Sequence, residues 1–171
     1  VPRCLMKTFA DFNNTRSMTG VMSADHAYRM AMAKAVKLLA HREHSAQELA
    51  SRLVSDFSAD VVSQVLQECT TRDWLNELRM TNSFVRSHAT RGHGPRRIQA
   101  DLRARGIADE LISEALSTND WFELARQTAR RKSEKPWLLE RNSLQRLHAF
   151  LIRRGFTVEQ AYYGCSADSE C

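Results

Sequence analysis

The stretch Arg91-Gly92-His93-Gly94-Pro95-Arg96-Arg97-Ile98 joins a glycine-rich loop to the start of a short helix. Proline suits the first helical position, because the amide hydrogen that it lacks would have no partner inside the helix there. Ile98 and Leu102 fall on one helical face, and Gly106 is placed to end the helix with a left-handed turn. The window therefore predicts a loop, a short amphipathic helix and a stop, before further apolar residues begin another helix.

The same pattern recurs on both sides of this window, at a period of about 49 residues that is typical of stacked structural repeats. The second and third copies stop at Arg-Gly-apolar, with Gly106 and Gly155, whereas the first copy lacks the glycine. Each short helix follows a longer helix and precedes another. The superposable apolar residues are Leu49-Leu53-Phe57, Ile98-Leu102-Ile107 and Leu147-Leu151-Phe156.

Because three short helices bury little apolar surface alone, neighbouring units must stack. We therefore predict an all-α fold of three tandem three-helix repeats, stacked into an elongated, curved molecule, with Trp74 and Trp121 in the core. Helix starts are marked by the capping boxes Ser45–Glu48 and Thr157–Gln160 and by the single caps Ser23 and Asp120. The expected segments are a poorly ordered N-terminal tail over 1–22, repeats over 23–75, 76–119 and 120–165, and a frayed C-terminus over 166–171.

Composition limits the class of protein. The chain has 171 residues, a net charge of +5 and an isoelectric point near 9.3, and arginine supplies most of the positive charge. A basic balance favours a polyanion or an acidic protein surface as partner, although it also fits a solvated surface. No apolar run approaches the ~18 residues of a membrane span, so no membrane partner is expected. The four cysteines form neither a disulfide framework nor a zinc pattern, which fits a reducing cytoplasm.

No pattern predicts catalysis. His41 and His44 stand close together, but no cysteine or carboxylate completes a metal set at standard spacing. The loop at Gly92 and Gly94 lacks the strand and the Gly-Lys pair of a nucleotide-binding loop. We therefore expect a protein that is not an enzyme and that holds neither a cofactor nor a metal ion.

Basic residues are the candidate contacts for a partner. On the helix that begins at Pro95, Arg96 and Arg103 share an outer face, whereas Arg97 is placed to pair with Asp101. Arg105 is expected near the core, where it can cap the last carbonyl groups. Two cations in the first turn oppose the helix dipole, which favours an anion site over a purely structural role.

A second basic group lies on the helices that follow. Arg126 and Arg130 are expected on the face opposite Trp121 and Ala125, which would continue a basic track across two successive units. A solvated charged face is the alternative. The complete set of candidate contacts is Arg91, Arg96, Arg97, Arg103, Arg126, Arg130, Arg131, Lys132, Lys135, Arg146 and Arg153.

Three runs of residues together resemble RecX, the family of bacterial proteins that regulate the RecA recombinase. The runs are His41-Arg42-Glu43-His44-Ser45-Ala46-Gln47-Glu48-Leu49, Arg91–Ile98 with Gly106-Ile107, and Arg153-Arg154-Gly155-Phe156. The resemblance covers residues 27–165 and rests on their order and spacing. The chain departs from the family between the first two units, where Asp73 replaces a glycine and Met80 an aromatic residue.

The resemblance implies three tandem three-helix repeats that need no chemistry of their own. We expect a monomer, because nothing in the sequence requires a dimer, although the sequence leaves the oligomeric state open. Such a regulator lies in the groove of the RecA filament on single-stranded DNA, bridges RecA subunits and touches the DNA backbone. It mainly inhibits RecA ATP hydrolysis, strand exchange and coprotease activity in homologous recombination, DNA repair and the SOS response. Whether it caps filament ends or lies along the groove stays open.

Two alternatives remain. One is a direct nucleic-acid binder of the helix-turn-helix type, although the short helices carry few Asn or Gln side chains to contact base edges. The other is a helical scaffold for an acidic protein.

Overall fold

The computed structural model describes residues 23–166, and in this range it contains helices and no strand. The all-α prediction is confirmed. The predicted tail over 1–22 and the last residues, 167–171, lie outside the described range. The elements are α1 (Ala24–His41), α2 (Ala46–Leu53), α3 (Ala59–Thr71), α4 (Glu77–Thr90), α5 (Pro95–Arg103), α6 (Asp109–Ser117), α7 (Trp121–Lys132), η1 (Pro136–Leu138), α8 (Arg141–Arg153) and α9 (Val158–Cys165).

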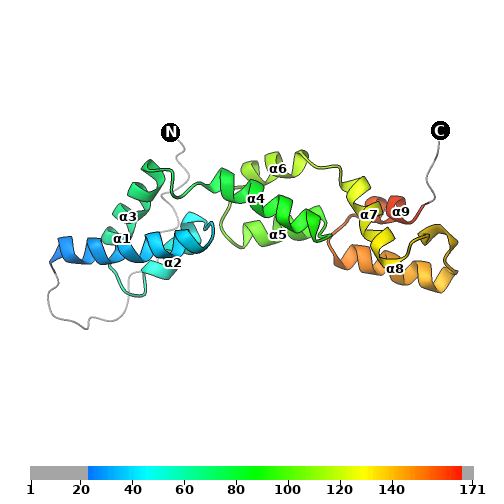
Figure 1. Cartoon of the computed structure of the whole chain (residues 1–171), viewed down its shortest axis with the longest axis horizontal. Coiled ribbons are helices and arrows are strands. Elements are labelled where there is room, and N and C mark those ends of the chain that lie inside the picture. The colour runs from blue at the N-terminus through cyan, green and yellow to red at the C-terminus, as the bar shows by residue number, and fades with distance from the viewer. Residues whose placement is uncertain (1–22, 167–171) are drawn as a thin grey trace.

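Each set of three successive α-helices surrounds a small apolar core. The first core contains Leu49 and Val65, the second Ile98 and Ile112, and the third is centred on Phe156. Figure 1 shows the units in sequence along one long axis, which confirms the elongated shape. A chain arranged in this way has several small cores in place of one large core, so contacts between units contribute to its stability.

The predicted helix signals are formed. Ser45 and Thr157 each complete a capping box, and the Asp120 carboxylate accepts hydrogen bonds from the backbone of Phe122 and Glu123 at 3.1 and 3.0 Å. Gly106 ends the turn after α5 with a φ of 77°. The local sequence therefore sets where these helices begin and end.

The turn between α3 and α4 keeps a glycine-like shape although Asp73 occupies it. Asp73 has a φ of 55°, and its carboxylate accepts hydrogen bonds from Asn76 at 2.7 Å and Arg79 at 3.0 Å. These bonds offset part of the cost of a left-handed backbone for a residue with a side chain. Trp74 is 40% exposed, so its predicted place in the core was wrong; the next residue, Leu75, is buried there instead.

The units are joined end to end through their second helices. At the first joint, the start of α2 meets the turn after α5, where the Ser45 hydroxyl donates to the Arg105 carbonyl at 2.6 Å. At the second joint, the start of α5 meets the turn after α8. There the Gly94 amide donates to the Arg154 carbonyl at 2.8 Å, and the Arg96 amide to the Gly155 carbonyl at 3.0 Å.

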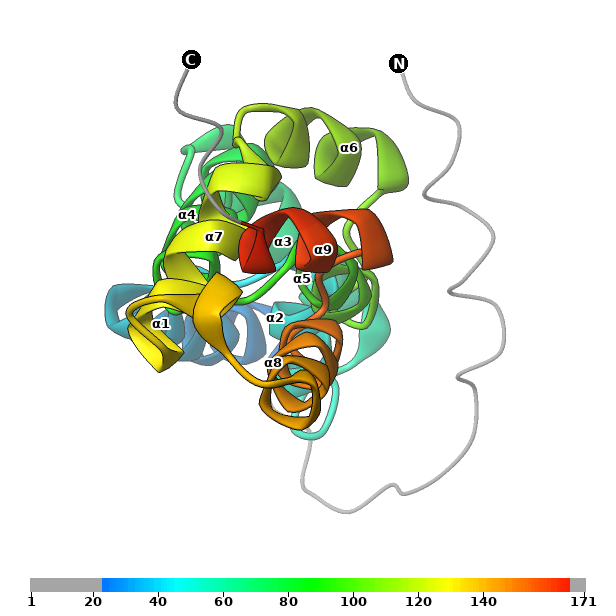
Figure 2. The same cartoon turned by 90° about the vertical axis from the view of Figure 1, so that its right-hand side faces the viewer.

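These joints set the two long edges of the molecule. In Figure 1, α2, α5 and α8 follow one another along the lower edge, whereas α3, α6 and α9 lie along the upper edge. The end-on view in Figure 2 agrees, because α6 and α8 lie on opposite sides of the molecule. The same part of each repeat therefore faces the same way.

The second joint depends on close backbone contact. A Cβ atom added to Gly94 would lie 2.3 Å from the backbone carbon of Gly155 and the nitrogen of Phe156. We expect Gly94→Ala to lower the free energy of unfolding by about 1–3 kcal/mol, because the joint must open to admit the methyl group. Urea unfolding measures the change, with Ala100→Ser on the exposed side of α5 as the control. Equal stability of the two variants would contradict this account of the joint.

Candidate anion-binding interface at the second joint

The second joint brings arginines together from three helices. The Arg154 guanidinium donates to the carbonyl of Arg91 at 3.1 Å, which ties the end of α8 to the end of α4. A Cβ atom on Gly155 would lie only 2.5 Å from the Cβ of Arg97, so the start of α5 is equally close. These contacts bring together Arg91, Arg97 and Arg154, and the exposed Arg96 and Arg153 are their neighbours in the sequence; we call these five residues the basic cluster. The sequence pattern identified each of these as a candidate except Arg154.

Little negative charge compensates this cluster. Within the described residues, no carboxylate lies within 4 Å of Arg91, Arg96 or Arg153. The predicted pair of Arg97 and Asp101 is formed only at 3.9 Å, beyond ordinary hydrogen-bond distance. The joint therefore presents a positive, solvent-accessible surface that suits an anionic partner.

Two half-buried histidines lie beneath these arginines. The Nδ1 atoms of His88 and His93 are 3.0 Å apart, and the His88 ring stacks on Phe84 with 3.9 Å between centroids. Burial lowers the pKa of both imidazoles; the charge of Arg97 lowers both further, and that of Arg154 lowers the pKa of His93. Asp101 raises both pKa values, but its effect does not prevail. At neutral pH the imidazoles are therefore mainly uncharged, so one Nδ1–H can donate to the other ring.

Arg131 and Lys132 extend the cluster along α7. The Arg131 guanidinium donates to the Thr90 carbonyl at 2.9 Å, beside Arg91. Lys132 lies 5.9 Å from the ring centroid of Phe150, and Arg154 lies 5.2 Å from the same ring. Lys135 and Arg146 are exposed in the third unit and form no hydrogen bond or ion pair with the cluster.

Two arginines of the second unit have partners that the helical pattern did not indicate. Arg103 donates to the Asp109 carboxylate at 2.6 Å, and this bond holds the pKa of Asp109 below its usual value. Arg105 pairs with Glu48 of the first unit and lies 4.9 Å from the ring centroid of Phe84. Its contribution is therefore to the first joint, where it forms an ion pair.

The expected position of Arg126 and Arg130 needs correction. Both side chains are half-buried; Arg126 pairs with Glu123 and lies 5.5 Å from the ring centroid of Tyr163 in α9. The reason is that α9 packs closely along α7, so that a Cβ atom on Gly164 would lie 2.9 Å from the Ala125 carbonyl carbon. This part of α7 is a helix interface and does not form the open outer face that the helical wheel predicted.

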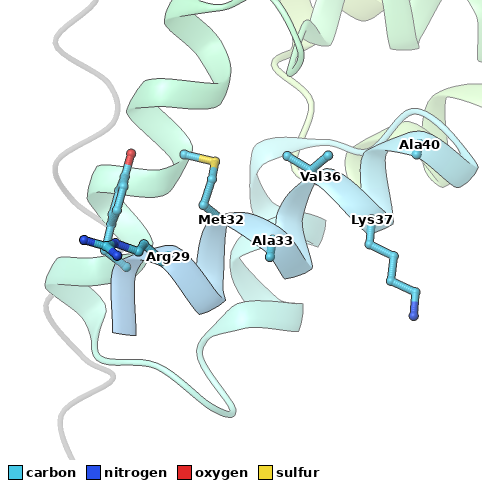
Figure 3. A pocket seen from close by; sticks show the side chains of 7 residues that line it. Arg29, Met32, Ala33, Val36, Lys37 and Ala40 are labelled. Atoms are coloured by element: carbon cyan, nitrogen blue, oxygen red, sulfur yellow. The ribbon is translucent and has the colours of Figure 1, made fainter. Parts of the chain in front are cut away.

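The described part of the chain contains a surface hollow but neither a metal-ligand group nor a membrane-spanning helix. No group of three or more His, Cys, Asp or Glu side chains in residues 23–166 could hold a metal ion. A hollow of about 550 Å³ lies along α1 (Figure 3). Its described lining consists of α1 residues such as Met32, Val36 and Lys37, and it contains no carboxylate. No described helix is long and apolar enough to cross a membrane.

The fold and this joint define an all-α tandem-repeat protein with a basic surface. Residues 31–69 match the first three-helix domain of RecX, and residues 76–116 match the second. The regulatory protein RecX of Halorhodospira halophila is 37% identical over 156 residues, which are 90% of this chain and 95% of the relative. That of Vibrio vulnificus is 31% identical over 138 residues, or 79% and 90% of the two chains.

The fold agrees with these relatives. The crystal structure of RecX from Lactobacillus salivarius superposes with a TM-score of 0.73 at 21% identity, over 83% of this chain and 96% of that chain. The chain belongs to the RecX family of regulatory proteins.

The histidine pair predicts how stability depends on pH. Folding lowers the pKa of both imidazoles, so the unfolded chain binds more protons than the folded chain. The contribution of the two histidines to the free energy of unfolding is therefore lost as pH falls below their unfolded pKa of 6.5. We expect the free energy of unfolding to fall between about pH 7.5 and about pH 5, and His93→Asn to reduce that fall. Urea titrations at both pH values measure this, with the exposed His41→Asn as the control. An identical pH dependence in both variants would contradict the assignment.

Proposed function

We propose that this protein binds the RecA filament on single-stranded DNA and restrains RecA ATP hydrolysis, strand exchange and coprotease activity. The observation that carries the proposal is membership of the RecX family, because relatives named as regulatory proteins match along nearly their whole length. The shape supports it. An elongated row of three units can contact several subunits of a filament at once.

The charge distribution supports an orientation on the filament. The helices α3, α6 and α9 contain no Lys or Arg, whereas the basic cluster stands on α5 and at the ends of α4 and α8, and α7 extends it. The edge formed by the second helices is therefore the one that attracts backbone phosphates. We propose that this edge faces the DNA strand inside the filament.

The same distribution disfavours the helix-turn-helix alternative. A recognition helix places its first residues in the major groove, close to phosphates. In this chain the third helix of each unit begins with acidic residues: Asp60 in α3, Asp109 and Glu110 in α6, and Glu159 in α9. Negative charges at those positions would be repelled by duplex DNA.

The proposal is tested by measuring the RecA ATPase on single-stranded DNA at increasing concentrations of this protein. We expect inhibition by the wild type. Arg96→Ala with Arg153→Ala should require a roughly tenfold higher concentration for the same inhibition, since each exposed charge contact contributes about 1 kcal/mol or less. Both side chains are exposed, so the variant should fold normally.

The matched control is Arg29→Ala with Lys37→Ala, which removes the same charge from the exposed side of α1. Unchanged ATPase in the presence of the wild type would contradict the proposed function. Preferential binding to one duplex sequence without RecA would instead support the helix-turn-helix alternative. Equal loss of inhibition in both double variants would show that overall charge, and not the second joint, determines binding.

A further inference from the structure

At the first joint the start of α2 meets the turn after α5, as the start of α5 meets the turn after α8 at the second joint, and an open cavity of about 190 Å³ lies there. Arg42 and the length of α2 form one wall, and the turn after α5 forms the other. At roughly 30 Å³ per water molecule, the cavity has room for about six waters or for one phosphate group with part of its hydration. Its lining consists of Arg42, Gln47, Glu48, Ser51, Arg52, Ala104 and Arg105.

The charges that line this cavity are unbalanced. Three arginines face one carboxylate, that of Glu48. Arg42 donates to both Glu48 oxygens, at 3.1 and 3.4 Å, and Arg105 donates to one of them. Burial alone would raise the pKa of Glu48, but these arginines and the Ser45 amide lower it below its usual value. The Glu48 carboxylate therefore stays ionised and holds the guanidinium groups of Arg42 and Arg105 in place. It neutralises only one of these two positive charges.

Arg52 adds a further positive charge that no carboxylate neutralises. Its side chain is exposed, and within residues 23–166 no carboxylate lies within 4 Å of it. Arg105 uses one of its three nitrogen atoms in the pair with Glu48. A guanidinium group has five N–H donors, so several donors at this joint remain for an anion.

The position of the cavity relates it to the second joint. The helix α5 starts at the second joint and ends at the first, and its nine residues span about 14 Å at 1.5 Å per residue. A single nucleic-acid strand held by Arg96 and Arg97 could therefore reach Arg52 by following α5. An acidic peptide that bound only at the first joint would not use this connection along α5.

We propose that the first joint binds one backbone phosphate of single-stranded DNA through Arg52, assisted by Arg42 and Arg105. The identity of the strand rests on the proposed function, whereas the site itself rests on the geometry of the joint. Glu48 is a positioning residue, since it orients two arginines and leaves their outer N–H groups available. The two joints then act as equivalent phosphate sites at the two ends of one helix.

The experiment measures binding of a fluorescently labelled oligothymidylate to the full chain, without RecA, over a range of salt concentrations. We expect Arg52→Gln to weaken binding several-fold and to reduce the slope of log K against log salt by about 0.7, the value for one phosphate contact on a single strand. Ser51→Asp places a negative charge in the cavity and should weaken binding further. The controls are Arg86→Gln and Ser87→Asp, which make the same charge changes on the exposed side of α4.

The salt slope determines the outcome. If the salt slope of Arg52→Gln equals that of the wild type or that of Arg86→Gln, the proposed phosphate site is wrong. RecA inhibition measured in parallel then shows whether the proposed function still holds. Two results together would indicate a free-phosphate site. Millimolar inorganic phosphate would protect the wild type, but not Arg52→Gln, from thermal unfolding, and both proteins would bind oligothymidylate equally. If polyglutamate binds in an Arg52-dependent manner and oligothymidylate does not, the result would point to an acidic protein as the partner of the first joint. Circular dichroism confirms that each variant is folded.

Discussion

The structure depends on close backbone contact between neighbouring units. At each joint, the start of the second helix of one unit meets the turn after the second helix of the next unit. At the second joint this contact leaves no room for a side chain on Gly94, because a Cβ atom there would overlap the backbone at Gly155 and Phe156. Each three-helix unit has a small core of its own, so units that did not meet in this way would expose apolar surface to water. The joint therefore sets both the order of the units and the direction of their edges.

The two joints use equivalent acceptors and different donors. The carbonyl groups of Arg105 and Arg154 each lie directly after the second helix of a unit; the first accepts from the Ser45 hydroxyl and the second from the Gly94 amide. A side-chain donor needs more space than a backbone donor, which agrees with the cavity at the first joint. Within residues 23–166 no other unit meets the turn after α2, and there Lys34 of α1 donates to the Arg52 carbonyl at 2.7 Å. The first repeat therefore satisfies this carbonyl with a side chain of its own.

Most of the fold follows from signals that act over a few residues. Caps, glycine stops and the apolar period were sufficient to predict the helices, because each signal satisfies or interrupts backbone hydrogen bonds locally. The site was predicted less completely. Arg105 and Glu48 are far apart in the sequence, so no helical period relates them. Arg126 was misplaced because a wheel drawn for α7 alone omits α9, which covers it. Trp74 was misplaced because its neighbour Leu75 enters the core.

The positive charge at the second joint is costly for the fold, and this cost bears on its role. Several guanidinium groups lie close together with one distant carboxylate, and they oppose protonation of the histidines beneath them. Two of these arginines also stand in the first turn of α5, where the helix dipole disfavours cations. The exposed Arg96 and Arg153 form no ion pair or side-chain hydrogen bond within the described residues, whereas Arg131 and Arg154 also donate to backbone carbonyl groups at the joint. Backbone contacts and these two arginines therefore close the joint, and the charge of the exposed arginines suits the anionic partner that we propose.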